Sequence, residues 1–200
     1  MNRNYIISLE YINFNSYSAS KYWQGFFAAK NLQDSAISKK AYLILQDYFS
    51  DMKNFFMLSC VLYFYEHKIQ SKYTERVVKK HQDSIKYFLE NGLLRKAEGE
   101  ICEQFAKYKE GLIKFPVELL QISFNADDFL RFLEMYLDLI LWRINGPCFL
   151  INSASRVAIY PHDEGGFGVI SFEENNQLGF DLLNFAEQSG EFNSYRVKNN

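Results

Sequence analysis

The sequence predicts a mainly α-helical protein, with about six helices followed by a small antiparallel β-sheet of about three short strands and a C-terminal helix. Two observations lead to this fold class. Apolar residues recur at helical spacing over much of residues 20–141, and turn-forming residues divide 147–172 into short apolar runs. We expect a single globular domain over residues 1–200, with a helical part at 1–146 and the small sheet plus helix at 147–190.

The first part of the chain is expected to enter a helix after an ambiguous start. Residues 5–14 alternate as a strand would, but they also fit a short helix. Ser20 is placed to cap a helix that carries Tyr22, Trp23, Phe26 and Phe27. Asp34 is placed to cap a longer helix that runs to Met52.

The middle of the chain predicts a series of further helices. Residues 55–70 are apolar nearly all round, which indicates a central buried helix. Thr74 begins a helix that ends before Gly92, and residues 93–109 form the next one, which ends before Gly111. A short helix follows Pro116, and a largely buried helix runs from Asn125, its N-cap, to residue 141.

The pattern changes after Pro147. Residues 148–151, 156–160 and 167–172 read as strands, separated by turn residues at 152–155 and 161–166. Ser171 and Glu174 have the spacing of a capping box for the last helix. That helix is expected to bury four apolar side chains before Gly190: Leu178, Leu182, Leu183 and Phe185.

Composition indicates a cytoplasmic globular protein. The chain is 48% hydrophobic and 23% charged, and aromatic residues reach 18%. The longest nearly uncharged apolar stretch, 55–65, is far shorter than the roughly 20 residues of a membrane span, and no secretory signal is visible. Three widely spaced cysteines, Cys60, Cys102 and Cys148, imply neither a disulfide framework nor a zinc site.

Charge is unevenly distributed along the chain despite a net charge of −2. Residues 66–117 carry 11 Lys or Arg against 8 Asp or Glu, whereas residues 118–195 carry 3 against 12, a local balance of −9. An acidic region repels nucleic acids and attracts basic proteins. We therefore expect no nucleic-acid partner and no membrane partner.

The residues suggest no catalytic site, no metal site and no cofactor. His67, His81 and His162 have no Cys, His or carboxylate at a known ligand spacing. The glycine-rich run at 165–168 follows two carboxylates and precedes a strand, which is unlike a phosphate-binding loop. Glu134 and Asp138 lie one helical turn apart, and they are interpreted as a solvated stripe.

One short segment resembles a known class of protein. Residues 156–170 combine a strand, an acidic glycine turn and a second strand, with seven characteristic positions: Tyr160, Pro161, Asp163, Gly165, Gly166, Val169 and Ile170. This segment resembles the C-terminal part of bacterial immunity proteins of polymorphic toxins and contact-dependent growth inhibition systems. The resemblance covers about 15 of the 200 residues.

The resemblance implies an immunity protein, without enzymatic activity, that binds and neutralises a cognate toxin domain. That domain is expected to be basic and nuclease-like, since toxins that cleave nucleic acids need basic clefts. The candidate contacts are Asp163, Glu164, Glu173 and Glu174, with Tyr160 as an aromatic anchor. Two alternatives stay open: a cytosolic regulatory or scaffold protein with an aromatic binding surface, and an enzyme that uses His162 and nearby carboxylates.

Overall fold

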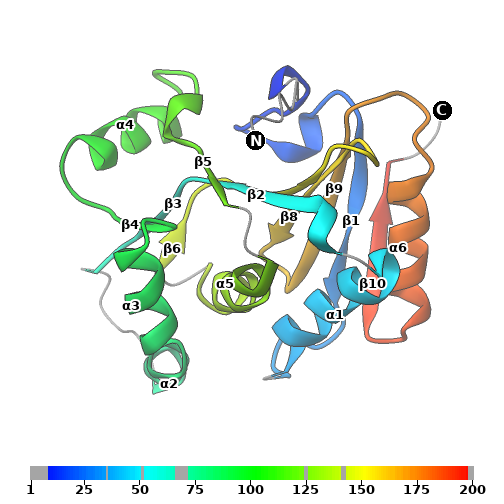
Figure 1. Ribbon diagram of the computed structural model, residues 1–200, viewed down its shortest axis with the longest axis horizontal. Coiled ribbons are helices and arrows are strands. Elements are labelled where there is room, and N and C mark those ends of the chain that lie inside the picture. The colour runs from blue at the N-terminus through cyan, green and yellow to red at the C-terminus, as the bar shows by residue number, and fades with distance from the viewer. Residues whose placement is uncertain are drawn as a thin grey trace.

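Two β-sheets form the centre of the molecule in the computed structural model, which describes residues 9–34, 36–50, 52–65, 72–123, 126–140 and 143–197 (Figure 1). The larger sheet has seven strands in the order β10-β1-β9-β8-β7-β2-β5, and every neighbouring pair is antiparallel. The bounds of these strands, in chain order, are β1 Trp23–Ala29, β2 Phe55–Ser59, β5 Gln121–Ser123, β7 Cys148–Asn152, β8 Val157–His162, β9 Gly166–Ser171 and β10 Phe192–Arg196.

The smaller sheet continues from the larger one. Its order is β4-β3-β6, formed by β4 Leu94–Lys96, β3 Val61–Tyr63 and β6 Ile144–Asn145. Only Cys60 separates β2 from β3, so one extended segment belongs to both sheets. β3 runs parallel to β4 and antiparallel to β6.

The described residues contain six α-helices. In chain order they are α1 Ile37–Phe49, α2 Lys72–Lys80, α3 Gln82–Glu90, α4 Gly99–Lys109, α5 Ala126–Leu139 and α6 Leu178–Gln188. α1, α5 and α6 cover one face of the large sheet, and α2 and α3 pack beside α5 (Figure 1). No helix among the described residues has the length and apolar character that crossing a membrane requires.

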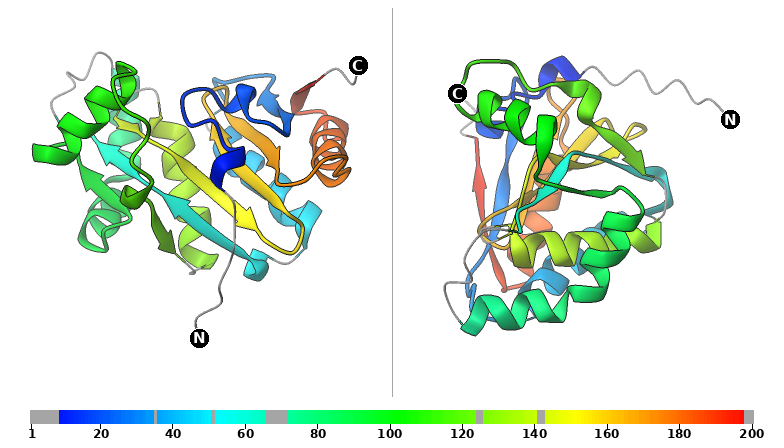
Figure 2. Two further views of the ribbon diagram at one scale, coloured as in Figure 1. Left: turned by 90° about the horizontal axis from the view of Figure 1, so that it is seen from above. Right: turned by 90° about the vertical axis from the view of Figure 1, so that its left-hand side faces the viewer.

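The opposite face of the large sheet is covered by 3-10 segments at Leu9–Tyr11 and Tyr17–Ala19, which lie over the strands in the left view of Figure 2. Two further 3-10 segments are Met52–Asn54, just before β2, and Val117–Leu119, after α4. α4 packs on this same side against the small sheet, where Phe105 and Tyr108 contact Cys60 and Leu62. The N-terminal segments and α4 therefore lie on the same side of the molecule, where the Tyr108 hydroxyl donates a hydrogen bond to the Phe14 carbonyl oxygen.

The main core lies between the large sheet and its helices. α5 contributes the largest share of any single element, because nearly every described apolar side chain along this helix is buried, including Phe129, Phe132 and Leu133 at 0% exposure. The sequence prediction of a largely buried helix here is confirmed. Its N-cap, Asn125, and its predicted end at residue 141 lie outside the described residues.

Asp138 on α5 links three helices through its carboxylate. It accepts hydrogen bonds from Ser38 of α1, Lys80 of α2 (2.8 Å) and His81 (2.7 Å between Nε2 and Oδ2). Lys80 also pairs with Glu134 at 2.9 Å. Burial alone would raise the pKa of Asp138, but these hydrogen bonds outweigh it and hold the pKa below its usual range. The acidic stripe of α5 is thus a paired, structural feature.

The predicted mainly α fold is wrong, since strands replace two of the expected helices. Residues 22–27 belong largely to β1, and 55–63 form β2 and β3 instead of a central helix. Every residue from Phe55 to Tyr63 is buried. A strand that is buried on both faces reads as a continuous apolar run, which periodicity cannot distinguish from a buried helix. Pairing of β1 and β2 with β9 and β7 also crosses the expected division at residue 146.

Smaller corrections concern the ends of elements. The expected helix from Thr74 is two helices, broken at His81, and residues 94–96 of the expected 93–109 helix are β4. Ser171 ends β9 and α6 begins only at Leu178, so the capping box is not formed. Phe185 is 36% exposed instead of buried. β5, β6 and β10 were not expected, and of residues 5–14 only 9–14 are described, with a 3-10 turn at Leu9–Tyr11.

Several expected elements are confirmed. α1 lies inside the predicted 34–52 segment, and Asp34 Oδ1 accepts a hydrogen bond from the Ala36 amide (2.9 Å) just before the helix begins. β7, β8 and β9 match the three predicted strands to within two residues at each end. Gly92 and Gly111 follow α3 and α4 with φ of 72° and 74°, the left-handed conformation expected after a helix.

Candidate functional site

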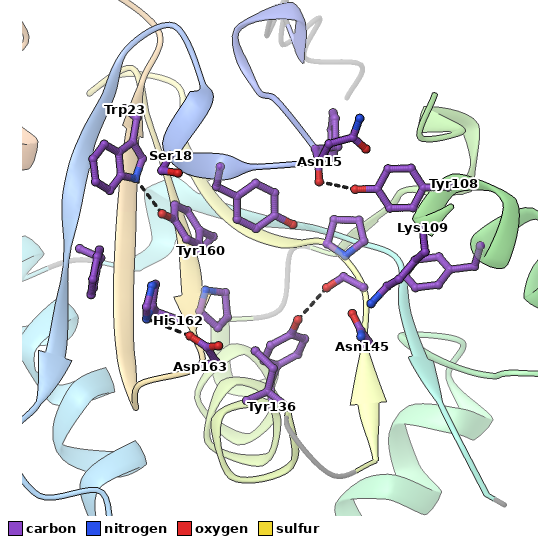
Figure 3. Close-up of a pocket in the computed structure, with 18 of the residues that line it drawn as sticks. Asn15, Ser18, Trp23, Tyr108, Lys109, Tyr136, Asn145, Tyr160, His162 and Asp163 are labelled. Atoms are coloured by element: carbon purple, nitrogen blue, oxygen red, sulfur yellow. Dashed lines mark hydrogen bonds and ion pairs between the residues drawn. The ribbon is translucent and has the colours of Figure 1, made fainter. Parts of the chain in front are cut away.

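An aromatic cleft of about 880 Å³ opens on the sheet face opposite α1, α5 and α6, between the N-terminal segments and the end of α4 (Figure 3). We call it the aromatic cleft. Its lining comes from five separate parts of the chain: residues 14–18, 23–26, 105–111, 136–147 and 160–163. Its size falls in the range of small-molecule and peptide-binding pockets.

The cleft exists because β7 and β8 separate. Their register includes Asn152↔Val157 and Leu150↔Ile159, but it does not continue to Pro161. Pro161 lacks a backbone N–H, as does Pro147 just before β7, so the ladder between these strands cannot be extended here. Beyond this point Tyr160–His162 pair only with β9. The gap is filled from below by Tyr136 of α5, whose hydroxyl donates to the Gly146 carbonyl oxygen at 2.6 Å.

Two glycines of β9 allow neighbouring groups to approach this strand closely. Along β8 and β9, alternate side chains point to opposite faces, and Gly166 and Gly168 occupy the cleft face of β9. A Cβ atom on Gly168 would lie 2.1 Å from Cζ of Tyr160. The ring of Tyr160 therefore lies over the backbone of β9, in space that any other residue at 168 would fill.

The Tyr160 hydroxyl accepts a hydrogen bond from Trp23 Nε1 at 2.8 Å, and Tyr17 packs on the Tyr160 ring with a centroid distance of 4.6 Å. Tyr160 is only 3% exposed, and burial raises its pKa to about 12. It is thus a fixed part of the cleft wall. A buried ring held in this way cannot project into a partner as the predicted anchor would.

His162 lies on the same face of β8 as Tyr160. Its ring stacks on Phe26 at 3.9 Å with an interplanar angle of 6°, and Phe26 stacks in turn on Tyr195 of β10 at 4.7 Å. Nδ1 of His162 is 3.2 Å from Asp163 Oδ1. Burial lowers the pKa of His162, although Asp163 and Glu164 act in the opposite direction. The imidazole is therefore mainly neutral near pH 7.

The predicted contact residues form two separate groups. Asp163 and Glu164 lie in the β8–β9 turn, and both side chains are exposed. Glu173 and Glu174 follow the far end of β9, about 20 Å away at the rise of an extended strand. Glu173 pairs with Arg156 at 2.8 Å, whereas in the described residues the Asp163 side chain contacts only His162. The structure does not bring the two groups together.

Four other carboxylates of the acidic region form ion pairs with nearby cations. Their cationic partners come from both early and late segments: Lys80 with Glu134 and Asp138, Lys40 with Glu191, and Arg196 with Glu187. The acidic excess of residues 118–195 therefore does not form a single unpaired surface. What remains beside the aromatic cleft is a small group of exposed carboxylates: Glu110, Asp163 and Glu164.

Sequence reasoning missed most of the cleft. Tyr17, Trp23, Tyr108 and Tyr136 lie far from residues 156–170 in the sequence, and no local pattern connects them. The one available signal was the pair of glycines at alternate positions, Gly166 and Gly168, because a strand with no side chains on one face leaves room there.

The described residues contain no group of three or more His, Cys, Asp or Glu that could hold a metal ion. All three cysteines are free, and burial raises the pKa of Cys60 and Cys148. These two thiols are therefore poor nucleophiles. No protein-family model, curated protein sequence or solved structure matches the chain, so the resemblance of residues 156–170 to immunity proteins gains no support from these comparisons.

Proposed function

We propose that the chain is a binding protein that neutralises a basic partner protein, as immunity proteins do, and that the partner inserts a cationic side chain into the aromatic cleft. The observation that carries this proposal is the meeting of aromatic rings and unpaired carboxylates in one cavity. Rings of Phe, Tyr and Trp attract Lys and Arg groups through their negative faces. Asp163 and Glu110, which line the cavity, supply the opposite charge at its rim.

The charge balance at the cleft favours a cationic occupant. Of the charged residues that line it, Lys109 contributes +1, while Glu110 and Asp163 contribute −2 in total, and His162 is mainly neutral near pH 7. Glu164 adds one more carboxylate beside Asp163. Complementary charges of this kind accelerate encounter with a basic protein and make its association rate sensitive to salt.

An enzymatic role is the weaker hypothesis. It has one observation in its favour, since His162 does face a cavity of substantial size next to a carboxylate. A hydrolase of the usual kind also needs a nucleophile within hydrogen-bonding reach of the base. Among the described residues, the side chain of His162 is bonded only within its own turn, to Asp163 and the Glu164 amide. The geometry therefore supports binding better than catalysis.

The experiment measures binding to the C-terminal domain of the protein encoded immediately upstream, at two salt concentrations. We expect a one-to-one complex whose association rate falls as salt rises. The double variant Asp163→Asn/Glu164→Gln should weaken binding at least about tenfold, because it removes both free carboxylates of the turn. Glu173→Gln/Glu174→Gln is the matched control, with the same charge change at the other end of β9.

The two double variants separate the possible outcomes. A change of less than about twofold in the control, together with the large loss for the turn variant, supports docking at the aromatic cleft. Equal losses for both variants would mean that general acidity, not the cleft, determines binding. Absence of any complex with the upstream product, in binding and in growth rescue upon co-expression, would overturn the proposed function.

A further inference from the structure

A second cavity of about 410 Å³ lies beside the aromatic cleft, between α4 and the start of β6. We call it the Arg143 cavity. It shares five lining residues with the aromatic cleft: Phe105, Lys109, Glu110, Ile140 and Asn145. In Figure 3, Lys109 extends from α4 towards Asn145, at the place where the two cavities meet.

Arg143 is a buried cation without an anionic partner in the described part of the chain. The residue is 7% exposed, and its Nη1 donates to the carbonyl oxygens of Phe64 (3.1 Å) and Tyr65 (2.6 Å). A guanidinium carries five N–H donors, and no other hydrogen bond of this side chain occurs among the described residues. A buried charge is costly unless it is paired, and two backbone carbonyls satisfy only one of the three nitrogens.

Lys109 adds a second positive charge to the same cavity. Its Nζ lies 5.7 Å from the ring centroid of Phe105, and it forms no ion pair within the described residues. Partial burial lowers the pKa of Lys109 below its usual range, although the residue as a whole is exposed to solvent. Glu110 is the single carboxylate in the lining, and it is exposed. The Arg143 cavity is therefore net positive, whereas the rim of the aromatic cleft is net negative.

The remaining walls are mostly apolar. They comprise Phe64, Phe105, Ala106, Ile140 and Ile144. A pocket with apolar walls and a few convergent polar groups is the usual form of a small-molecule site. The planar fork of a guanidinium matches a carboxylate in particular, since it can donate two parallel hydrogen bonds to it.

We propose that the Arg143 cavity binds a small organic carboxylate, whose charged end lies between Arg143 and Lys109 and whose apolar body packs against Phe105 and Ile140. The proposal does not rest on the proposed partner docking, because it uses neither Asp163 nor Glu164, although Lys109 and Phe105 line both cavities. Its ligand would supply a negative charge that these two cations do not receive from the described residues.

Phenylacetate and its neutral amide, phenylacetamide, test the proposal by titration calorimetry and by the shift in melting temperature of the full chain. We expect phenylacetate to bind with 1:1 stoichiometry and to raise the melting temperature. Phenylacetamide should bind at least about tenfold more weakly, because it loses charge-assisted hydrogen bonds. Equal binding of the two compounds, or no binding of phenylacetate at millimolar concentration, would overturn the proposal.

Three variants locate the site. Lys109→Met should reduce phenylacetate affinity about tenfold, whereas Lys107→Met, the same change two residues earlier on α4 and outside the cavity lining, should leave it unchanged. Ala106→Trp should abolish binding by filling the cavity while leaving both cations in place. Arg143 also fixes the backbone at residues 64–65, so Arg143→Lys is used only if it folds. Unaltered affinity in both Lys109→Met and Ala106→Trp would place the ligand elsewhere and contradict the inference.

Discussion

The two faces of the large sheet are built from the same strands but are packed differently. On the face towards α1, α5 and α6, β8 and β9 present Val157, Ile159, Phe167 and Val169, all at 0% exposure. On the opposite face, the same two strands present Ala158, Tyr160 and Ile170, which are also buried, and then His162 at the edge of the cleft. The first face is therefore close-packed along its length, whereas the second is packed at one end and borders the cleft at the other.

The two faces of the sheet therefore differ in how much they stabilise the fold and in how much space they leave for a ligand. Apolar side chains that interdigitate with helices contribute most of the free energy of folding. On the cleft face, Gly166 and Gly168 contribute no packing of their own, and Tyr195 remains 48% exposed beside the half-buried Phe26. A face that stays partly uncovered in this way is typical of a binding surface.

A substitution on the face towards α1, α5 and α6 is expected to lower the free energy of unfolding most. Phe132→Ala in α5 should lower the free energy of unfolding by about 3–5 kcal/mol, because it leaves a cavity in a fully buried part of the core. Phe26→Ala is the control on the cleft face. It should cost about 1 kcal/mol or less, since its ring is only half-buried and burial stabilises in proportion to the apolar area removed from water. Urea denaturation measures both, and equal losses would contradict the comparison.

A smaller loss of stability is expected from adding a methyl group at Gly168. Gly168→Ala should destabilise the protein by about 1–3 kcal/mol, because the new methyl group would overlap the Tyr160 ring. The same variant should weaken the Trp23–Tyr160 hydrogen bond, which tryptophan fluorescence can report. Gly99→Ala is the control: its φ of 61° carries the ordinary left-handed penalty, but nothing lies within 4 Å of the added Cβ. An unchanged fluorescence spectrum in Gly168→Ala would mean that Tyr160 does not depend on this space.

The same comparison explains how much of the fold could be predicted from the sequence. β7, β8 and β9 were predicted because local chemistry marks their ends: Pro147 before β7, and the turn residues at 152–155 and 163–165. The ends of β1 and β2 are not marked by turn-forming residues in this way. Their apolar residues on both faces also fit a helical template, and their strand character comes from pairing with β9 and β7, whose paired residues lie 89 to 147 positions away.

In the candidate site too, residues that are neighbours in the sequence could be predicted, whereas residues brought together by the fold could not. His162 and Asp163 were singled out because they are neighbours in the sequence, and the structure places both in the cleft lining. Lys109, Arg143 and Tyr136 come from other elements, so their convergence depends on the sheet topology. Their individual residue types carried no unusual pattern, and a Lys near the end of α4 or an Arg before β6 reads as an ordinary surface charge until its surroundings are known.

The smallest expected effect concerns His162, the titratable group of the cleft face. Because its folded pKa lies below the unfolded value of about 6.5, the unfolded chain binds a proton first as the pH falls. His162 therefore imposes no penalty above about pH 6.5, and stability is lost as the pH drops from there through the folded pKa. His162→Gln should flatten this slope between pH 7 and 5, by less than about 1 kcal/mol because the ring is partly exposed. NMR titration of the imidazole checks the direction, and a folded pKa above 6.5 would show that Asp163 and Glu164, not burial in the stack on Phe26, dominate at this position.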